Sequence, residues 1–169
     1  MVIDLRNCIG CGACSVVCGQ TNKMPSNLWR RVFDCGINGP PERERLSLPI
    51  SCMHCDEPPC LGVCPTTATY KDKKNGIVMM DKKRCIGCKT CMAACPYNAR
   101  YFDEEVRAVD KCNFCFDTRI SKGETETACM AACPAQVRIF GDLTDFDSEL
   151  YKLVHAPEKI VWEIGRAHV

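Results

Sequence analysis

The stretch that decides how this chain folds is Cys85-Ile86-Gly87-Cys88-Lys89-Thr90-Cys91-Met92-Ala93-Ala94-Cys95-Pro96. Its spacing, C-x2-C-x2-C-x3-C followed by proline, is a signature of chains that bind 4Fe-4S clusters. Three thiolates on one tight loop can hold three corners of a cube, and the fourth, which starts a short helix, points toward a second cube. Gly87 leaves room for backbone beside inorganic sulfide, and Pro96 ends the run because it has no amide hydrogen. One such run therefore implies two clusters.

Three more runs of four cysteines occur along the chain. Run one has the same spacing, but Gly19 replaces the final proline, which weakens the turn and not the ligation. In run two the middle gap opens to four residues, and in run four an insert of thirteen residues separates the two pairs. The members are Cys8, Cys11, Cys14 and Cys18 in run one, Cys52, Cys55, Cys60 and Cys64 in run two, and Cys112, Cys115, Cys129 and Cys133 in run four. With run three at 85–95, sixteen thiolates are available, enough for four cubes.

The cysteine content, 17 of 169 residues, is typical of either a secreted disulfide scaffold or a metal protein. Repeated C-x2-C pairs place neighbouring thiols on one loop, where they suit a metal better than a cross-chain bridge, and the count is odd. Zinc held by four cysteines is the main alternative metal, because the C-x2-C half of run four alone matches a zinc knuckle. The last half of run four and its three sister runs favour iron and sulfide instead.

The formal net charge of +1 treats every cysteine as neutral. An oxidised 4Fe-4S core with four thiolates carries roughly 2−, so four of them give a net charge of about −7, which offers little support for nucleic-acid binding. No uncharged apolar stretch is long enough for a membrane span. Residues 1–5 are expected to form a short strand, and because the opening residues show no basic region, long apolar run or twin arginine, we expect no signal peptide there.

The segments between the runs predict short elements. Residues 68–71 with 77–80, and 100–102 with 106–109, are separated by turn-forming residues and predict two hairpins. Residues 135–140 predict a strand, and Asp145 is a candidate cap for a short helix that carries Phe146, Leu150, Leu153 and Val154. Residues 19–45 contain so many breakers that we expect no regular structure there, although Trp29, Val32 and Phe33 are expected to pack.

Several residues lie outside the cluster spacing or are surplus to it. Cys35 belongs to no run, and we interpret it as a small buried hydrophobe. His54 lies inside run two, where four thiols already suffice, so a hydrogen-bonding or surface role is favoured over iron ligation. A basic group is expected to be a solvated face, with docking of an acidic partner or tuning of cluster potential as the alternative. Its members are Lys71, Lys73, Lys74, Lys82, Lys83 and Arg84.

Exchange of the fourth ligand requires that the runs be taken in pairs, and spacing alone leaves the pairing open: one with two and three with four, or the middle two inside the outer two. Four segments besides the runs add a resemblance: Met1-Val2-Ile3-Asp4-Leu5-Arg6-Asn7-Cys8, Leu28-Trp29-Arg30-Arg31, Lys111-Cys112-Asn113-Phe114-Cys115 and Phe140-Gly141-Asp142-Leu143. With them the chain resembles, over residues 1 to about 155, the four-cluster electron-transfer subunits of molybdopterin oxidoreductases, such as polysulfide, thiosulfate, tetrathionate and DMSO reductases.

That resemblance implies an α+β fold made of two interleaved bacterial-type 2[4Fe-4S] ferredoxin-like modules. The inner module would be residues 46–110 with runs two and three, the outer module 1–45 plus 111–144 with runs one and four, and 145–169 a C-terminal helix and tail. It also implies four ligand groups, which we number 1 to 4: Cys8, Cys11, Cys14 and Cys133; Cys18, Cys112, Cys115 and Cys129; Cys52, Cys55, Cys60 and Cys95; and Cys64, Cys85, Cys88 and Cys91.

The function expected from the resemblance is that of a non-catalytic electron-transfer subunit, which needs no acid, base or nucleophile of its own. Four clusters would relay single electrons between a large molybdenum- or tungsten-pterin catalytic subunit, next to group 1, and a quinone-linked membrane partner or soluble carrier. The alternative is a polyferredoxin subunit of a cytoplasmic tungsten aldehyde oxidoreductase, hydrogenase or formate dehydrogenase complex. A self-contained redox enzyme is disfavoured because no flavin, nicotinamide or haem motif occurs. Export by a twin-arginine partner to the periplasm and a cytoplasmic location are both compatible with the sequence.

Overall fold

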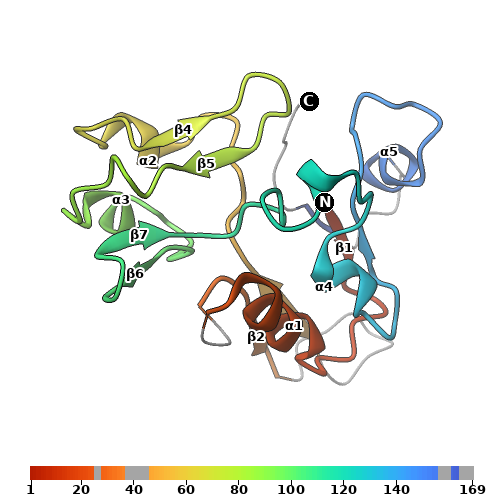
Figure 1. The fold of residues 1–169 in the computed structure, drawn as a ribbon. Helices are drawn as coiled ribbons and strands as arrows, with labels where there is room; N and C mark the ends of the chain where they lie inside the picture. Colours follow the sequence, from red (N-terminus) through yellow and green to blue (C-terminus); the bar gives the residue numbers. More distant parts are fainter. Residues whose placement is uncertain (25–27, 37–45, 156–160, 164–169) are drawn as a thin grey trace.

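The computed structural model describes residues 1–24, 28–36, 46–155 and 161–163. These residues form short helices and strands joined by cysteine-rich loops (Figure 1), a mixed content that agrees with the ferredoxin-like α+β expectation. The elements are β1 (Val2–Asp4), α1 (Ala13–Asn22), β2 (Arg31–Asp34), β3 (Ser47–Ile50), α2 (Pro59–Gly62), β4 (Thr69–Lys71), β5 (Val78–Met80), α3 (Thr90–Ala93), β6 (Tyr101–Asp103), β7 (Ala108–Asp110), η1 (Ile120–Lys122), α4 (Ala128–Ala131), β8 (Arg138–Ile139), α5 (Glu149–Val154) and β9 (Val161–Glu163).

The strands pair in small antiparallel sheets. Both predicted hairpins are confirmed, as β4–β5 with Thr69 opposite Met80 and as β6–β7 with Tyr101 opposite Asp110. The predicted strand at residues 1–5 is β1, which pairs with β8 on one side and β9 on the other. In Figure 1, both hairpins lie with α2 and α3 in one half of the molecule, and α1, α4, β1 and α5 lie in the other.

The expectation that residues 19–45 lack regular structure is wrong. Helix α1 continues past run one to Asn22, and β2 pairs with β3. The helix continues because Gly19 keeps the amide hydrogen that proline would remove. In the other three runs proline follows the last cysteine, and the helices α2, α3 and α4 are four residues long. The missing proline of run one thus lengthens its helix.

Packing beside β2 differs from the expectation in part. Trp29 is buried as predicted and Val32 is half-buried, but Phe33 is exposed. Cys35 is also exposed, so its interpretation as a buried hydrophobe is wrong. It lies just beyond the exposed end of β2, and its backbone amide donates to the Leu46 carbonyl at 2.8 Å.

The C-terminal elements correct two further expectations. The strand predicted at 135–140 shrinks to β8, because Gln136 adopts a left-handed φ of 51° that a strand cannot contain. The cap of α5 is Ser148, whose Oγ accepts from the Tyr151 amide at 3.1 Å, and not Asp145. Of the helix's predicted apolar residues, Leu150 and Val154 are buried, whereas Phe146 is exposed.

The buried core contains cysteines among its apolar side chains. One buried cluster joins β1, α1 and the start of run four, with Ile3, Trp29 and Phe114 among its members. A second joins the two hairpins through Val78 and Val109 and includes Cys60 and Cys91. Within the part of the chain described, no helix combines the length and the apolar character needed to cross a membrane.

Candidate iron-sulfur cluster sites

The cysteine loops share one backbone feature. The residue before the second cysteine has a positive φ in every run: Gly10 at 68°, His54 at 45°, Gly87 at 71° and Phe114 at 56°. At Gly87 a side chain would also meet the Arg107 carbonyl at 3.1 Å and the Phe102 ring at 3.2 Å, so glycine is required there. Run two and run four place His54 and Phe114 in this strained conformation, and the two rings stack at 3.9 Å.

A second feature recurs after the last cysteine of runs two, three and four. The third residue beyond that cysteine again has a positive φ, and its amide donates to the cysteine carbonyl. The bonds run from Thr67 to Cys64 at 3.2 Å, from Asn98 to Cys95 at 3.1 Å and from Gln136 to Cys133 at 3.1 Å. The chain therefore turns sharply directly after the last cysteine of each of these three runs.

The structure brings together thiols from runs that are distant in sequence. The thiolate of Cys8 lies close enough to those of Cys14 and Cys133 for electrostatic repulsion. The thiolate of Cys18 is likewise repelled by those of Cys112, Cys115 and Cys129. Cys55 interacts with Cys52, Cys60 and Cys95, Cys88 with Cys64, and Cys91 with Cys85. Helix α1 packs on α4 and α2 packs on α3. Run one therefore lies beside run four, and run two beside run three.

The surroundings of group 1 suit an iron-sulfur cluster. Its four thiols line one small cavity together with short or apolar residues, including Gly10, Gly12 and Ala135. Thiolates are the donors that 4Fe-4S clusters take. Among the described residues no three His, Cys, Asp or Glu side chains form a group that could hold a single metal ion.

Burial governs the protonation of many of these thiols. Burial raises the pKa of Cys112 to about 11, and it also raises the pKa of Cys18, Cys55 and Cys115. Such thiols hold their protons until a positive charge stabilises the thiolate, and iron supplies that charge. Backbone amides already point at sulfur: those of Gly87 and Val109 donate to Cys85 at 3.4 and 3.5 Å.

The comparisons with known proteins agree with this chemistry. A family model described as a 4Fe-4S dicluster domain matches residues 44–143. The chain belongs to this family. The match favours iron-sulfur clusters over the zinc alternative, since the seventeen cysteines include four runs of four, two of them with the full C-x2-C-x2-C-x3-C spacing.

Three relatives show more specifically which proteins this dicluster protein is similar to. It is 41% identical to the B subunit of tetrathionate reductase from Salmonella typhimurium, over 92% of the chain and 62% of the relative. It is 42% identical to the B subunit of polysulfide reductase from Wolinella succinogenes, over 91% of the chain and 81% of the relative. It is 43% identical to the thiosulfate reductase electron transfer subunit of Salmonella typhi, over 74% and 66%. The resemblance to the electron-transfer subunits of such reductases is confirmed, and the chain spans less than two thirds of the first of these relatives.

Buried cations form the part of the site that the sequence reasoning missed. Arg30, Arg100, Lys111 and Arg138 are each at most 4% exposed. Arg100 donates to the sulfur of Cys60 at 3.0 Å, and Arg138 donates to that of Cys14 at 3.3 Å. Both arginines stand five residues after the last cysteine of their run, at Cys95 and Cys133. This shared position is the feature of the sequence from which the role of these two arginines in the dicluster protein could have been predicted.

Each of these two arginines serves two runs. Besides its hydrogen bond to Cys60, the positive charge of Arg100 stabilises the thiolate of Cys91. Besides its hydrogen bond to Cys14, the positive charge of Arg138 stabilises the thiolate of Cys129. All four of these cysteines are the third of their run. Burial raises the pKa of Cys129, but Arg30, Arg138 and Thr127 together outweigh it, so that this pKa is lowered. The guanidinium groups therefore supply positive charge where thiolates of two runs meet.

His54 and Lys111 join the two halves of the molecule. The Val78 amide donates to His54 Nδ1 at 3.1 Å, and Lys111 Nζ donates to the carbonyls of Val78 and Cys112. The hydrogen-bonding role predicted for His54 is confirmed, whereas a surface role is wrong because the ring is fully buried. Burial, followed by the charge of Lys111, lowers the pKa of His54, so the ring is neutral.

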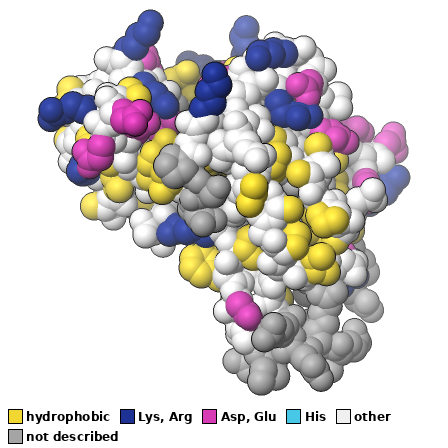
Figure 2. Space-filling model, turned by 60° about the horizontal axis from the view of Figure 1, so that its bottom comes forward, with side chains coloured by type: hydrophobic (Ala, Val, Ile, Leu, Met, Phe, Trp, Pro, Cys, Tyr) yellow, Lys and Arg dark blue, Asp and Glu magenta, His cyan; other side chains and the backbone are white. Residues whose placement is uncertain are grey.

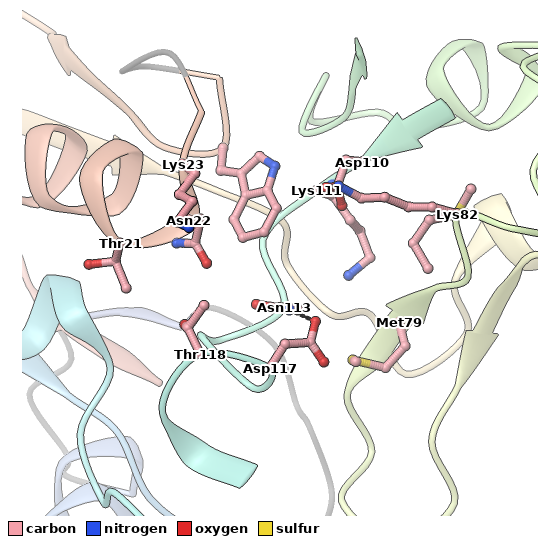
Figure 3. Close-up of a pocket in the computed structure, with 12 residues that line it drawn as sticks. Thr21, Asn22, Lys23, Met79, Lys82, Asp110, Lys111, Asn113, Asp117 and Thr118 are labelled. Atoms are coloured by element: carbon pink, nitrogen blue, oxygen red, sulfur yellow. Dashed lines mark hydrogen bonds and ion pairs between the residues drawn. The ribbon is translucent and has the colours of Figure 1, made fainter. Parts of the chain in front are cut away.

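A polar cavity opens beside this junction (Figure 3). Asn22 and Thr21 at the end of α1 line it, as do Asn113 and Asp117, which point toward one another and are hydrogen bonded at 2.7 Å. Lys82, which forms an ion pair of 2.5 Å with Asp110, lines the opposite side. Residues of both halves and Lys111 line the cavity, which therefore lies between the two halves.

The predicted basic group is largely solvated. Lys73, Lys74 and Lys83 are exposed, while Lys71 is half-buried and donates to the Asp56 carbonyl at 3.0 Å. On the face shown in Figure 2, lysine and arginine side chains are interspersed with acidic ones along the upper edge, and hydrophobic side chains occupy the centre. The interpretation of a solvated face therefore agrees with the exposure of these lysines.

Proposed function

We propose that this chain is a non-catalytic electron-transfer subunit that carries four 4Fe-4S clusters and relays single electrons within a reductase complex. The observation that carries the proposal is the pairing of thiols from run one with run four and from run two with run three. The named relatives are subunits of sulfur-compound reductases, which favours this function over the polyferredoxin alternative.

The sixteen ligands fall into the four groups given above. Groups 1 and 2 would belong to the outer module, residues 1–45 plus 111–144, and groups 3 and 4 to the inner module, residues 46–110, with 145–169 as a separate C-terminal part. The packing of α1 on α4 and of α2 on α3 supports this interleaved division. The chain's own contribution is to hold, bury and space the clusters, which supply the one-electron chemistry.

The contacts between groups support a linear order. Arg138 lies between thiols of groups 1 and 2, Cys112 of group 2 interacts with Cys52 of group 3, and Arg100 lies between groups 3 and 4. The order 1-2-3-4 places groups 1 and 4 at the ends. Each end group contains an exposed cysteine, Cys11 and Cys88, as expected where electrons enter and leave.

The partners follow from the relatives and from this order. Electrons would pass at group 1 to or from a large molybdenum- or tungsten-pterin catalytic subunit. A quinone-linked membrane subunit or a soluble carrier would dock near group 4. The substrate of the complex is set by that catalytic partner and not by this chain.

Replacing Cys133 with alanine tests the pairing. Iron, sulfide and electron paramagnetic resonance spectra are measured on the anaerobically purified complex, with wild type expected to hold about sixteen irons from four cubes. The Cys133→Ala variant should lose or alter the group 1 signal and keep both inner signals. Loss of an inner signal instead would show that the pairing is wrong, and wild-type protein without iron and sulfide would refute the function.

A further inference from the structure

Arg30 is a buried cation whose donors are not satisfied by the described protein. Its side chain is 1% exposed, and Ser15 Oγ holds its backbone by donating to the Arg30 carbonyl at 2.8 Å. Within the described residues, Nε and Nη1 of its guanidinium find no hydrogen-bond acceptor. A buried charged group without partners is costly, so an acceptor is expected beside it.

The neighbours of Arg30 identify where that acceptor lies. Its charge acts on the thiols of Cys18, Cys112, Cys115 and Cys129, which together make up group 2. Burial opposes the charged guanidinium, but the thiolates, with Cys129 first, outweigh it and raise the pKa of Arg30. Of the group 1 thiols, Cys14 also acts on Arg30, but after the three group 2 thiols, and Cys8 is reached by Arg138.

The other two buried arginines show what is distinctive about Arg30. Arg100 and Arg138 each donate to a cysteine sulfur and each acts on both clusters of its module. Arg30 has free donors and is aimed mainly at one group. Inorganic sulfide is the acceptor that a cluster in group 2 would add, and hydrogen bonds to sulfur raise a cluster's reduction potential.

We propose that Arg30 donates hydrogen bonds to the sulfur of the cluster in group 2 and raises that cluster's reduction potential above the value its thiolates alone would give. The inference rests on the proposed function. The hydrogen bonds of Arg30 affect one step, in which the group 2 cluster is reduced by one electron and the neighbouring cluster that gives the electron is oxidised. No proton is transferred and no bond is formed or broken. A fixed positive charge stabilises the more negative, reduced cluster more strongly than the oxidised one. Group 2 therefore becomes a resting position for the electron between the end cluster and the inner pair.

The test is a redox titration of the holo-complex followed by paramagnetic resonance. Cys18→Ser, which substitutes an oxygen ligand, identifies the signal of group 2. Arg30→Met removes the charge while keeping a side chain of similar length. It should lower the reduction potential of the group 2 cluster by about 59 mV, which is about a tenfold shift toward the oxidised form for one electron. Arg30→Lys, which keeps the charge but not the planar fork, should recover more than half of this shift.

Arg31→Met is the matched control. Arg31 is the next residue and also an arginine, but it is half-buried and donates to the backbone carbonyls of Tyr97 and Asn98. This variant should leave the group 2 signal unchanged. If Arg30→Met does not assemble, the neutral variant Arg30→Gln takes its place, and if neither neutral variant assembles, Arg30→Lys must still show a smaller shift in the same direction.

Four unshifted potentials in the Arg30 variants that assemble, or an equal shift in all four, would overturn the inference. A shift confined to a signal other than that of group 2 would also overturn it. These results leave four clusters in place and are therefore distinct from failure of the proposed function, in which the wild-type chain lacks the clusters.

Discussion

Buried thiols and buried guanidinium groups are each unfavourable alone, and this chain places them together. Seven of its cysteines are buried, and three arginines lie among them. At Cys129 the charges of Arg30 and Arg138 outweigh burial and the pKa of the thiol is lowered, whereas at Cys112 burial outweighs the charge of Arg30 and raises the pKa to about 11. The balance between burial and nearby cations therefore differs even between two thiols of group 2.

Cys35 provides a residue-scale test of the ligand groups. Because its thiol is exposed and belongs to no run, Cys35→Ser should keep the full iron and sulfide content, with stability within about 0.5 kcal/mol of wild type. Cys60→Ser, at a buried thiol to which Arg100 donates, is the matched variant and should alter the group 3 signal. Iron and sulfide analysis with paramagnetic resonance measures both. A cluster lost from Cys35→Ser would mean that this thiol is a ligand.

The spacing of the cysteines was sufficient to predict the cluster chemistry, because a loop with C-x2-C-x2-C has few other uses. The buried arginines were not predicted, since arginine in a sequence is ordinarily a surface residue. Arg100 and Arg138 share a position five residues after a run, but Arg30 has no such position. Its burial follows from tertiary packing that brings α1 and run four around it, which spacing does not encode.

Among the elements, the hairpins were predictable because turn residues separate their strands at short range. The β2–β3 ribbon was missed because breakers in residues 36–41 separate strands that pair only in the folded molecule. The effect of Gly19 was also misjudged: it was expected to weaken a turn, whereas it lengthens α1 to Asn22. Local chemistry therefore predicted the loops and turns more reliably than the lengths of the elements.

Glycine in the run three loop gives a prediction at the element scale. Gly87→Ala places a side chain at a φ of 71° against the Arg107 carbonyl at 3.1 Å and the Phe102 ring at 3.2 Å. The left-handed conformation alone costs alanine about 1–2 kcal/mol, and the contacts add to it. We therefore expect a loss of about 2–3 kcal/mol in the free energy of unfolding of the holo-protein, and an altered group 4 signal.

Gly12→Ala is the control for that substitution. Gly12 has a similar φ of 75°, but no atom lies within 4 Å of an added side chain. Only the conformational cost of about 1–2 kcal/mol should remain. Denaturant unfolding of both variants under anaerobic conditions measures the difference, and equal losses would show that the space around Gly87 is not limiting.

At the scale of the whole molecule, the two halves repeat one plan with an offset along the chain. Runs two and four hold His54 and Phe114 at the strained loop position, and runs one and three hold Gly10 and Gly87 there. Run four followed by run one thus corresponds to run two followed by run three. One half is closed only when the N-terminal β1 meets β8, so its assembly requires segments about 135 residues apart.

From this construction we expect the fold to depend on its clusters. Removing iron and sulfide with a chelator and an oxidant would leave Arg30, Arg100 and Arg138 buried among thiols that burial tends to keep protonated. Because binding energy at such sites is folding energy, we expect the treated chain to lose its cooperative unfolding transition. Circular dichroism during thermal unfolding and limited proteolysis measure this, with untreated protein as the reference and restored iron and sulfide as the reversal. A treated chain that kept its transition and its protease resistance would show instead that packing alone holds the two halves.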